Sequence, residues 1–208
     1  MATTTFSGAV RSKGGFTSVS ENATTGAFTT LSSISSTGVS SFDANTMAVE
    51  AGTGITTGSG TIYRSAVQRM GGIITTRILI DLTGLRSTGS GDIIGVNGTA
   101  LVCHIGQITA AKNGTILTGS MECFEAPAGG DPDINIHSAT EGTGVEDGAI
   151  SNLTETLLVN AGDATLGSKV YFTAVPAADE FLYLTTGDAT DADYTAGKLF
   201  IELMGYEA

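Results

Sequence analysis

Tryptophan is absent from this chain of 208 residues, histidine and cysteine occur only twice each, and aromatic residues make up 6% of the total. Sites that hold sugars or bases usually depend on exposed aromatic rings, so this scarcity disfavours them. A catalytic triad needs a histidine held between a carboxylate and a nucleophile, and no Gly-x-Ser-x-Gly motif accompanies the two histidines. We therefore expect no enzymatic activity, no catalytic residue and no cofactor.

Long hydrophobic runs are also missing. Residues 1–20 contain no continuous apolar core of the kind that a secretory signal requires. The most apolar stretch, residues 72–85, is interrupted by Arg77 and Asp81, so it does not predict a transmembrane span. Cys103 and Cys123 are too few for a disulfide framework and are expected to be buried free thiols. No membrane contact is expected.

Basic residues are scarce in the C-terminal part of the chain. Residues 1–120 contain seven basic and five acidic residues, whereas residues 121–208 contain two basic and sixteen acidic ones. The net charge of −12 therefore arises from the C-terminal part, which should present an acidic surface. Such a surface repels phosphate backbones, so no nucleic-acid partner is expected.

Small and hydroxylated residues dominate the first 60 positions, with 13 Thr, 11 Ser and 9 Gly. Residues 16–31 form a weak hairpin pattern, but they contain too few apolar residues to bury it alone. Residues 1–60 are therefore predicted to be an extended N-terminal arm that orders against a neighbouring subunit.

Residues 61–208 are predicted to be a β-sandwich domain. Strand patterns cover residues 73–82, 92–96, 133–138, 169–175, 180–185 and 198–206. Residues 63–70 are open between an edge strand, which is favoured, and a short helix that ends at Gly71-Gly72, and residues 150–159 are open between a strand and a helical turn. Turn residues separate them at near-even spacing, and no sustained amphipathic helix intervenes. The predicted fold is all-β, an antiparallel β-sandwich that is jelly-roll-like, with an extended N-terminal arm.

The strongest local pattern predicts a hairpin over residues 101–125. Two strand-like runs flank residues 111–115, where an Asn-Gly pair suits a three-residue loop. This register places Cys103 opposite Cys123 on one side of the ribbon. On the other side it places His104 opposite Glu122.

Two acidic stretches are candidates for metal binding. On a strand, Asp133, Asn135 and His137 share one face, although this alternation is also typical of any half-exposed strand. The solvent-exposed reading is favoured, and no metal site is predicted there.

The second stretch contains Asp188, Asp191 and Asp193, with Gly197 after them. Its spacing departs from the calcium-loop pattern, which has ligands at positions 1, 3 and 5 and Gly at 6. A solvated acidic loop is the favoured interpretation, with a weak calcium site at subunit contacts as the alternative.

Several segments together resemble a family of structural proteins from tailed bacteriophages of marine and other environmental bacteria. They are residues 6–12 (FSGAVRS), 76–85 (TRILIDLTGL), 91–95 (GDIIG), 105–109 (IGQIT), 130–134 (GDPDI), 143–147 (TGVED) and 191–198 (DADYTAGK). The resemblance covers about residues 73–206 and implies a virion component on the capsid surface, assembled in the host bacterial cytoplasm.

Within that family we expect a head decoration, or cement, protein. The resemblance then implies a homotrimer whose partner is the major capsid protein. A tail or fibre subunit that contacts host glycan, or a sugar-binding β-sandwich module, are the alternatives.

Overall fold

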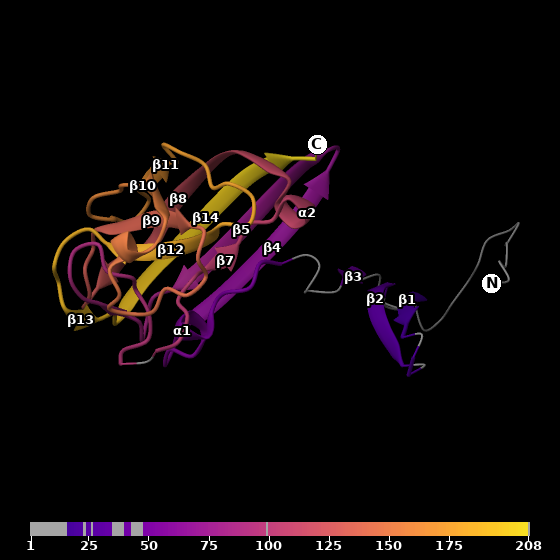
Figure 1. Cartoon of the computed structure of the whole chain (residues 1–208), viewed down its shortest axis with the longest axis horizontal. Helices are drawn as coiled ribbons and strands as arrows, with labels where there is room; N and C mark the ends of the chain where they lie inside the picture. Colours follow the sequence, from indigo (N-terminus) through magenta and orange to yellow (C-terminus); the bar gives the residue numbers. More distant parts are fainter. Residues whose placement is uncertain are drawn as a thin grey trace, which may run out of the picture. The chain divides into compact units, whose positions relative to one another are not determined.

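The computed structural model describes residues 16–22, 24–25, 27–34, 40–42, 48–98 and 100–207. The chain divides into two compact units, Met1–Met47 and Ala48–Ala208 (Figure 1). Each unit is built from antiparallel strands, so the predicted all-β class is confirmed. Among the described residues, no helix is long and apolar enough to cross a membrane.

The first unit contains a three-stranded antiparallel sheet in the order β1-β2-β3. Its strands are β1 (Phe16–Glu21), β2 (Phe28–Ile34) and β3 (Ser40–Phe42). The hairpin predicted over residues 16–31 is confirmed, with Phe16 opposite Ile34. The Asn22 side chain accepts hydrogen bonds from the backbone N–H groups of Thr24 and Thr25, which closes the turn.

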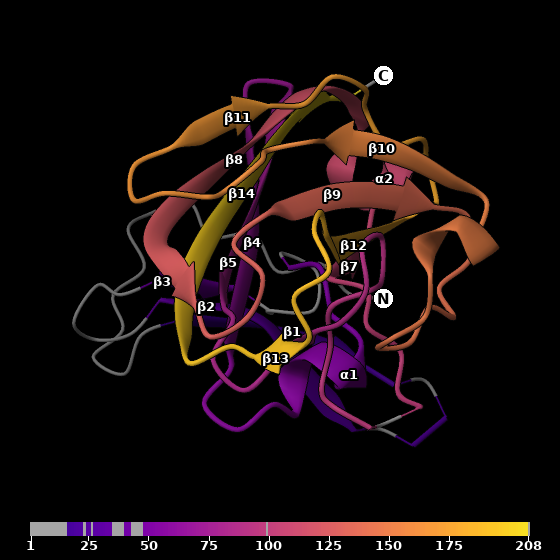
Figure 2. The same ribbon diagram turned by 90° about the vertical axis from the view of Figure 1, so that its left-hand side faces the viewer.

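The second unit contains two main sheets, which face each other in Figure 2. The first has the order β11-β8-β14-β5-β4, formed by β11 (Lys169–Tyr171), β8 (Thr115–Ala128), β14 (Ala196–Tyr206), β5 (Ile73–Asp81) and β4 (Ile62–Met70). The second has the order β10-β9-β12-β7, formed by β10 (Glu155–Val159), β9 (Ile134–Ala139), β12 (Phe181–Thr186) and β7 (Gly106–Gln107).

Smaller elements complete this unit. They are the pair β6 (Arg86–Ser87) and β13 (Ala192–Asp193), the short helices α1 (Thr53–Thr56) and α2 (Ala110–Asn113), and a 3₁₀ turn, η1 (Ile150–Asn152). The segment left open in the sequence, residues 150–159, therefore contains both a helical turn and a strand.

Eight of these strands form a jelly roll. In chain order they run β5, β7, β8, β9, β10, β11, β12 and β14, and they pair from the outside inward: β5 with β14, β7 with β12, β8 with β11 and β9 with β10. This nesting describes one antiparallel ribbon whose successive pairs fall alternately in the two sheets. Wrapping a ribbon in this way is the jelly-roll topology, and β4 extends it by one edge strand.

Aliphatic side chains from the inner faces of both sheets fill the core. β14 alternates regularly, with Leu199, Ile201 and Leu203 fully buried between half-buried or exposed neighbours. The period of two follows from strand geometry, which points successive side chains to opposite faces. Of the aromatic residues whose burial the structure describes, only Tyr183 and Tyr194 are among the largest fully buried side chains.

The sandwich begins earlier than the predicted boundary at residue 60, because residues 48–60 pack with it. Val49 and Ile55 are 2% and 0% exposed within the core. The Val49 carbonyl accepts hydrogen bonds from the Tyr63 and Ser65 hydroxyl groups of β4. The buried side chains and these hydrogen bonds attach residues 48–60 to the second unit.

The hairpin predicted over residues 101–125 is wrong. The first run joins the four-stranded sheet, since the Ile105 N–H donates to the Leu182 carbonyl, whereas β8 lies in the other sheet. Thr109 begins α2 between them and accepts the Lys112 N–H with its hydroxyl group. Gly114 does have a left-handed φ of 68°, but it ends a helical turn and not a hairpin loop.

Both cysteines are buried and free, as expected, but they are not cross-strand partners. The Cys103 N–H donates to the Gly144 carbonyl, whereas Cys123 pairs with Leu199 in β14. The predicted pairing of His104 with Glu122 is also wrong. The His104 ring packs against Phe181, with 5.0 Å between the ring centroids.

Candidate functional site

Charge is distributed very unevenly over the second unit. The strands of the five-stranded sheet contain five basic and four acidic residues. The rest of residues 48–207 contains two basic and fifteen acidic residues. The sheet is therefore close to neutral, and nearly all the excess negative charge belongs to the remainder of the unit.

Ion pairs neutralise the charges on this sheet. Arg77 Nε lies 2.7 Å from Glu202 Oε2 across the β5–β14 pair. Lys198 pairs with both Asp81 and Glu125 from neighbouring strands. Exposed pairs of this kind contribute little to stability, but they place opposite charges side by side, so the field around each pair is weak.

Large apolar side chains are exposed on the same strands. Of the thirteen exposed large hydrophobic residues in the described part of the chain, eight lie on this sheet: Met70, Tyr171, Leu117, Phe124, Ile62, Ile73, Met204 and Tyr206. Phe124 also stacks on Phe200 with 5.2 Å between the ring centroids. We call the outer surface of the sheet β11-β8-β14-β5-β4 the neutral face. Exposed apolar side chains on one sheet are a feature that protein contacts use.

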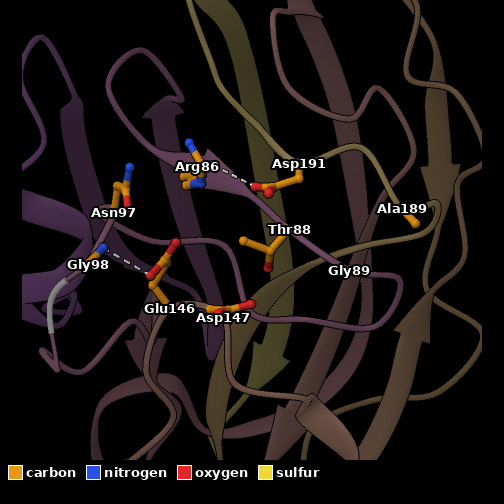
Figure 3. A pocket seen from close by; sticks show the side chains of 9 residues that line it. All are labelled: Arg86, Thr88, Gly89, Asn97, Gly98, Glu146, Asp147, Ala189 and Asp191. Carbon is orange, nitrogen blue, oxygen red and sulfur yellow. Dashed lines mark hydrogen bonds and ion pairs between the residues drawn. The ribbon is translucent and has the colours of Figure 1, made fainter.

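A polar pocket of about 390 Å³ lies beside β6 (Figure 3). Its lining comes from four separate segments: Arg86, Thr88, Gly89, Asn97, Gly98, Glu146, Asp147, Ala189 and Asp191. Arg86 is held by ion pairs to Asp191 at 2.7 Å and to Asp193 at 2.9 Å. Its charge is thus already balanced by two carboxylates.

Glu146 is the buried carboxylate of this pocket, at 8% exposure. Its Oε2 atom accepts the Gly98 N–H over 3.2 Å. Burial raises the pKa of the Glu146 carboxyl, and the neighbouring Asp147 raises it further. Asp147, which has a left-handed φ of 62°, also lines the pocket (Figure 3).

The lining of this pocket suits a polar ligand. The lining offers the carboxylates of Glu146, Asp147 and Asp191, the amide of Asn97 and the hydroxyl group of Thr88. With Arg86 already paired, the pocket is acidic. A ligand that donates hydrogen bonds, such as a polyol or a cation, fits this chemistry.

Asp133, Asn135 and His137 do not come together as a ligand set. Asn135 Oδ1 accepts the Ala161 N–H, and His137 Nδ1 lies 3.1 Å from the Thr185 hydroxyl group. The strand is more enclosed than the half-exposed pattern suggested, because β9 lies between β10 and β12 and His137 is only 9% exposed. Each side chain has a different partner or environment.

The acidic residues near position 190 form ion pairs and hydrogen bonds at the polar pocket and beside it. Asp191 and Asp193 pair with Arg86, while the Asp188 N–H donates to Asp131 Oδ2. Within the ranges that the structure describes, no group of three His, Cys, Asp or Glu side chains could hold a metal ion.

Sequence reasoning considered Asp191 but missed Arg86, Glu146 and Asp147 as its neighbours. These residues come from loops that are distant in sequence, so no local spacing relates them. One usable signal existed: Arg86 is the one basic residue within the stretch 78–111. An isolated cation in an acidic chain predicts carboxylate partners, although it does not say which ones.

No family model matches this chain, and neither a curated protein nor a solved structure is similar enough to be matched.

Proposed function

We propose that this protein is a structural subunit of a bacteriophage virion, a decoration protein that binds the outer head shell and stabilises it. The observation that carries the proposal is the neutral face, which offers exposed apolar side chains on a sheet while the rest of the domain is acidic. A subunit that acts by surface complementarity needs such a contact surface and no reactive centre.

The acidic remainder complements this role. Two basic and fifteen acidic residues outside the five strands would direct the other surfaces toward solvent and keep neighbouring copies apart. The neutral face is then the side that can approach a protein shell without a large electrostatic penalty. A protein that binds only the assembled shell stabilises it by mass action. In this proposal the partner is the major capsid protein.

The copy number in purified particles tests the proposal. Quantitative mass spectrometry should find a ratio to the major capsid protein near one, or a simple fraction such as one third. A ratio of a few per cent would move the protein to the tail or a fibre. Its absence from particles would overturn the virion assignment.

Surface variants test the contact itself. Tyr171→Ser and Met204→Ser remove two exposed apolar side chains from the neutral face, where they are 66% and 40% exposed. Leu157→Ser removes a 38% exposed side chain from β10 in the other sheet and is the matched control. We expect the first two variants to bind shells several-fold more weakly and the control to bind normally.

The polar pocket favours a second candidate, a tail or fibre subunit that contacts host glycan. Its carboxylates and the Asn97 amide are groups that hydrogen-bond sugar hydroxyls. Calorimetric titration with host-surface glycans, repeated on Asp191→Asn and Glu146→Gln, tests this candidate. Binding that these variants abolish would favour it over decoration.

A further inference from the structure

β4 is an open edge of the five-stranded sheet. Its nine residues pair with β5 on one side, in a register from Ile62 opposite Asp81 to Met70 opposite Ile73 without a bulge. On its other side, no strand among the described residues pairs with it. Such an edge presents a row of unpaired backbone groups that can accept another strand.

The turn after β4 identifies the backbone groups that point outward. Gly71 and Gly72 have φ values of 60° and 83°, the left-handed pair of a two-residue type I′ turn. In such a hairpin Met70 and Ile73 form a hydrogen-bonded pair, and the residues of β4 alternate from there. Tyr63, Ser65, Val67 and Arg69 therefore direct their N–H and C=O groups to the open edge.

The usual protections of an edge strand are few in β4. It contains no proline, and its register has no bulge. The nearby Val49 N–H donates to the Ser65 hydroxyl group, which is a side-chain contact and not a pairing with the backbone of β4. Arg64 and Arg69 are its charged residues. Arg69 is partly engaged, since its guanidinium donates to the Ala111 carbonyl and to Glu207.

We propose that β4 pairs antiparallel with β4 of a second copy of this chain, about a two-fold axis at Ala66. The two five-stranded sheets would then form one continuous sheet of ten strands. This register uses all nine residues of each edge and brings the outward-pointing backbone groups opposite one another, with Ser65 facing the partner's Val67 and Tyr63 facing the partner's Arg69. The pairing does not depend on the proposed virion function.

The side chains of β4 are complementary to themselves in this register. Ile62 and Met70, which are 46% and 75% exposed, lie at opposite ends of the strand. Two-fold pairing places Ile62 of each copy opposite the partner's Met70, so that both become covered. It also places Arg64 opposite the partner's Gln68, so no like charges meet directly.

Charge favours the same approach. Each copy carries a net charge of −12, so most surfaces of two copies repel each other. The β4 edge is an exception, because Arg64 and Arg69 lie on it and Arg77 pairs with Ala66 from the next strand. β4 itself contains no acidic residue, and of the carboxylates beside it Glu207 pairs with Arg69 and Asp81 with Lys198.

Cysteine cross-linking tests the register in the full-length chain. At the axis, Ala66 would face its own copy in a non-hydrogen-bonded pair, where Cα atoms are about 4.5 Å apart and a disulfide can form. Ala66→Cys should cross-link into a dimer under mild oxidation. Gln68→Cys is the matched control, because its two copies would be roughly 13 Å apart and should not cross-link.

Association in solution tests the interface without a cross-link. Ala66→Arg places two guanidinium groups at the axis, each beside Arg77 of its own chain, and should weaken the dimer about tenfold. Gln68→Glu meets the partner's Arg64 and should strengthen the dimer several-fold. Sedimentation of both variants and of the unmodified chain measures these shifts. A protein that sediments as a monomer at every concentration overturns the proposal. So does a trimer, the state expected from the sequence, if Ala66→Cys also fails to form a cross-linked dimer. Cross-linking of Gln68→Cys instead would overturn the register.

Discussion

Asn113 Nδ2 donates a hydrogen bond to the Thr76 Oγ1 atom over 2.7 Å, which ties the end of α2 to the inner face of β5. Asn113 is fully buried, and its Oδ1 atom also accepts the backbone N–H of Thr109 over 2.9 Å. One amide therefore satisfies a helix-start donor and a buried hydroxyl group at once. This contact fixes where the chain leaves the four-stranded sheet and enters β8.

Replacing Asn113 with Ala should destabilise the fold by about 2–4 kcal/mol, because it leaves two buried polar groups without partners. Urea unfolding measures this loss. Asn97→Ala, at an exposed position, should change the stability by less than about 0.5 kcal/mol. In a Thr76→Val background, Asn113→Ala should cost less than it does alone. Strict additivity of the two substitutions would contradict the coupling.

Gly95 leaves room for the sulfur atom of Cys103. A Cβ atom at Gly95 would lie 2.3 Å from Cys103 Sγ, although the backbone there is not left-handed, so Gly95→Ala should destabilise the fold by about 1–3 kcal/mol. Cys103→Ala removes the sulfur and should restore much of this loss in the double variant. Thermal unfolding of the four proteins in the cycle measures the effect.

Gly54 provides the control for this cycle. A Cβ atom there would meet Cys103 Sγ at 2.4 Å and also the Leu101 carbonyl oxygen at 2.7 Å. Cys103→Ala removes the sulfur but leaves the clash with the Leu101 carbonyl oxygen, so it should restore little of the stability that Gly54→Ala loses. Equal rescue at both glycines would show that steric crowding by the sulfur is not the cause.

These contacts explain what the sequence could and could not predict. The strands β5 and β14 were predictable because their alternation is local: Leu199, Ile201 and Leu203 follow one another at a period of two. The pairing of residues 101–109 could not be predicted, because an Asn-Gly pair such as Asn113-Gly114 occurs both in hairpin loops and at the ends of helices. A distant residue, Thr76, distinguishes the two.

The polar pocket was not predictable for a related reason. Arg86 and Asp191 are more than one hundred residues apart in the chain, and they meet because β6 pairs with β13. Only the topology of the jelly roll brings these loops together. The neutral face was partly predictable, since the charge imbalance is visible in the sequence, but its assignment to one sheet required the strand order.

The two thiols should be unreactive in the folded protein. Burial raises the pKa of the Cys103 thiol to about 11 and also raises the pKa of Cys123. At pH 8 neither residue should react rapidly with Ellman's reagent, since the thiolate is the reactive form. In denaturant two thiols per chain should be released. A rapidly reacting thiol in the native protein would contradict the burial of these residues.

Asp133 should make the fold less stable at neutral pH than an amide would. Burial raises the pKa of its carboxyl, and Asp131, Asp188 and Asp163 raise it further; its Oδ1 atom has no hydrogen-bond partner within the described structure. Asp133→Asn should therefore increase the free energy of unfolding by roughly 1 kcal/mol at pH 7.

The sign of this effect follows from the raised pKa. Above the folded-state pKa, the native protein bears the cost of a buried charge, and the cost disappears as the pH falls toward the unfolded value near 3.8. The advantage of Asp133→Asn should thus shrink between neutral pH and about pH 4. Urea unfolding at several pH values measures it, with Glu50→Gln at an exposed position as control. A gain that is independent of pH would argue against the carboxyl group as its origin.

Truncation separates the two units. Removal of Met1–Met47 should leave the sandwich folded, because its core runs from Val49 onward. Binding to the shell should be lost together with the predicted arm, whereas the proposed β4 pairing should remain. Removal of residues 1–60 should unfold the protein, since it also deletes Val49 and Ile55 and leaves the inner side of β4 uncovered. Circular dichroism and thermal unfolding distinguish the two truncations. If both proteins remain folded, the segment 48–60 contributes little to the core; if both unfold, the sandwich depends on its N-terminal unit.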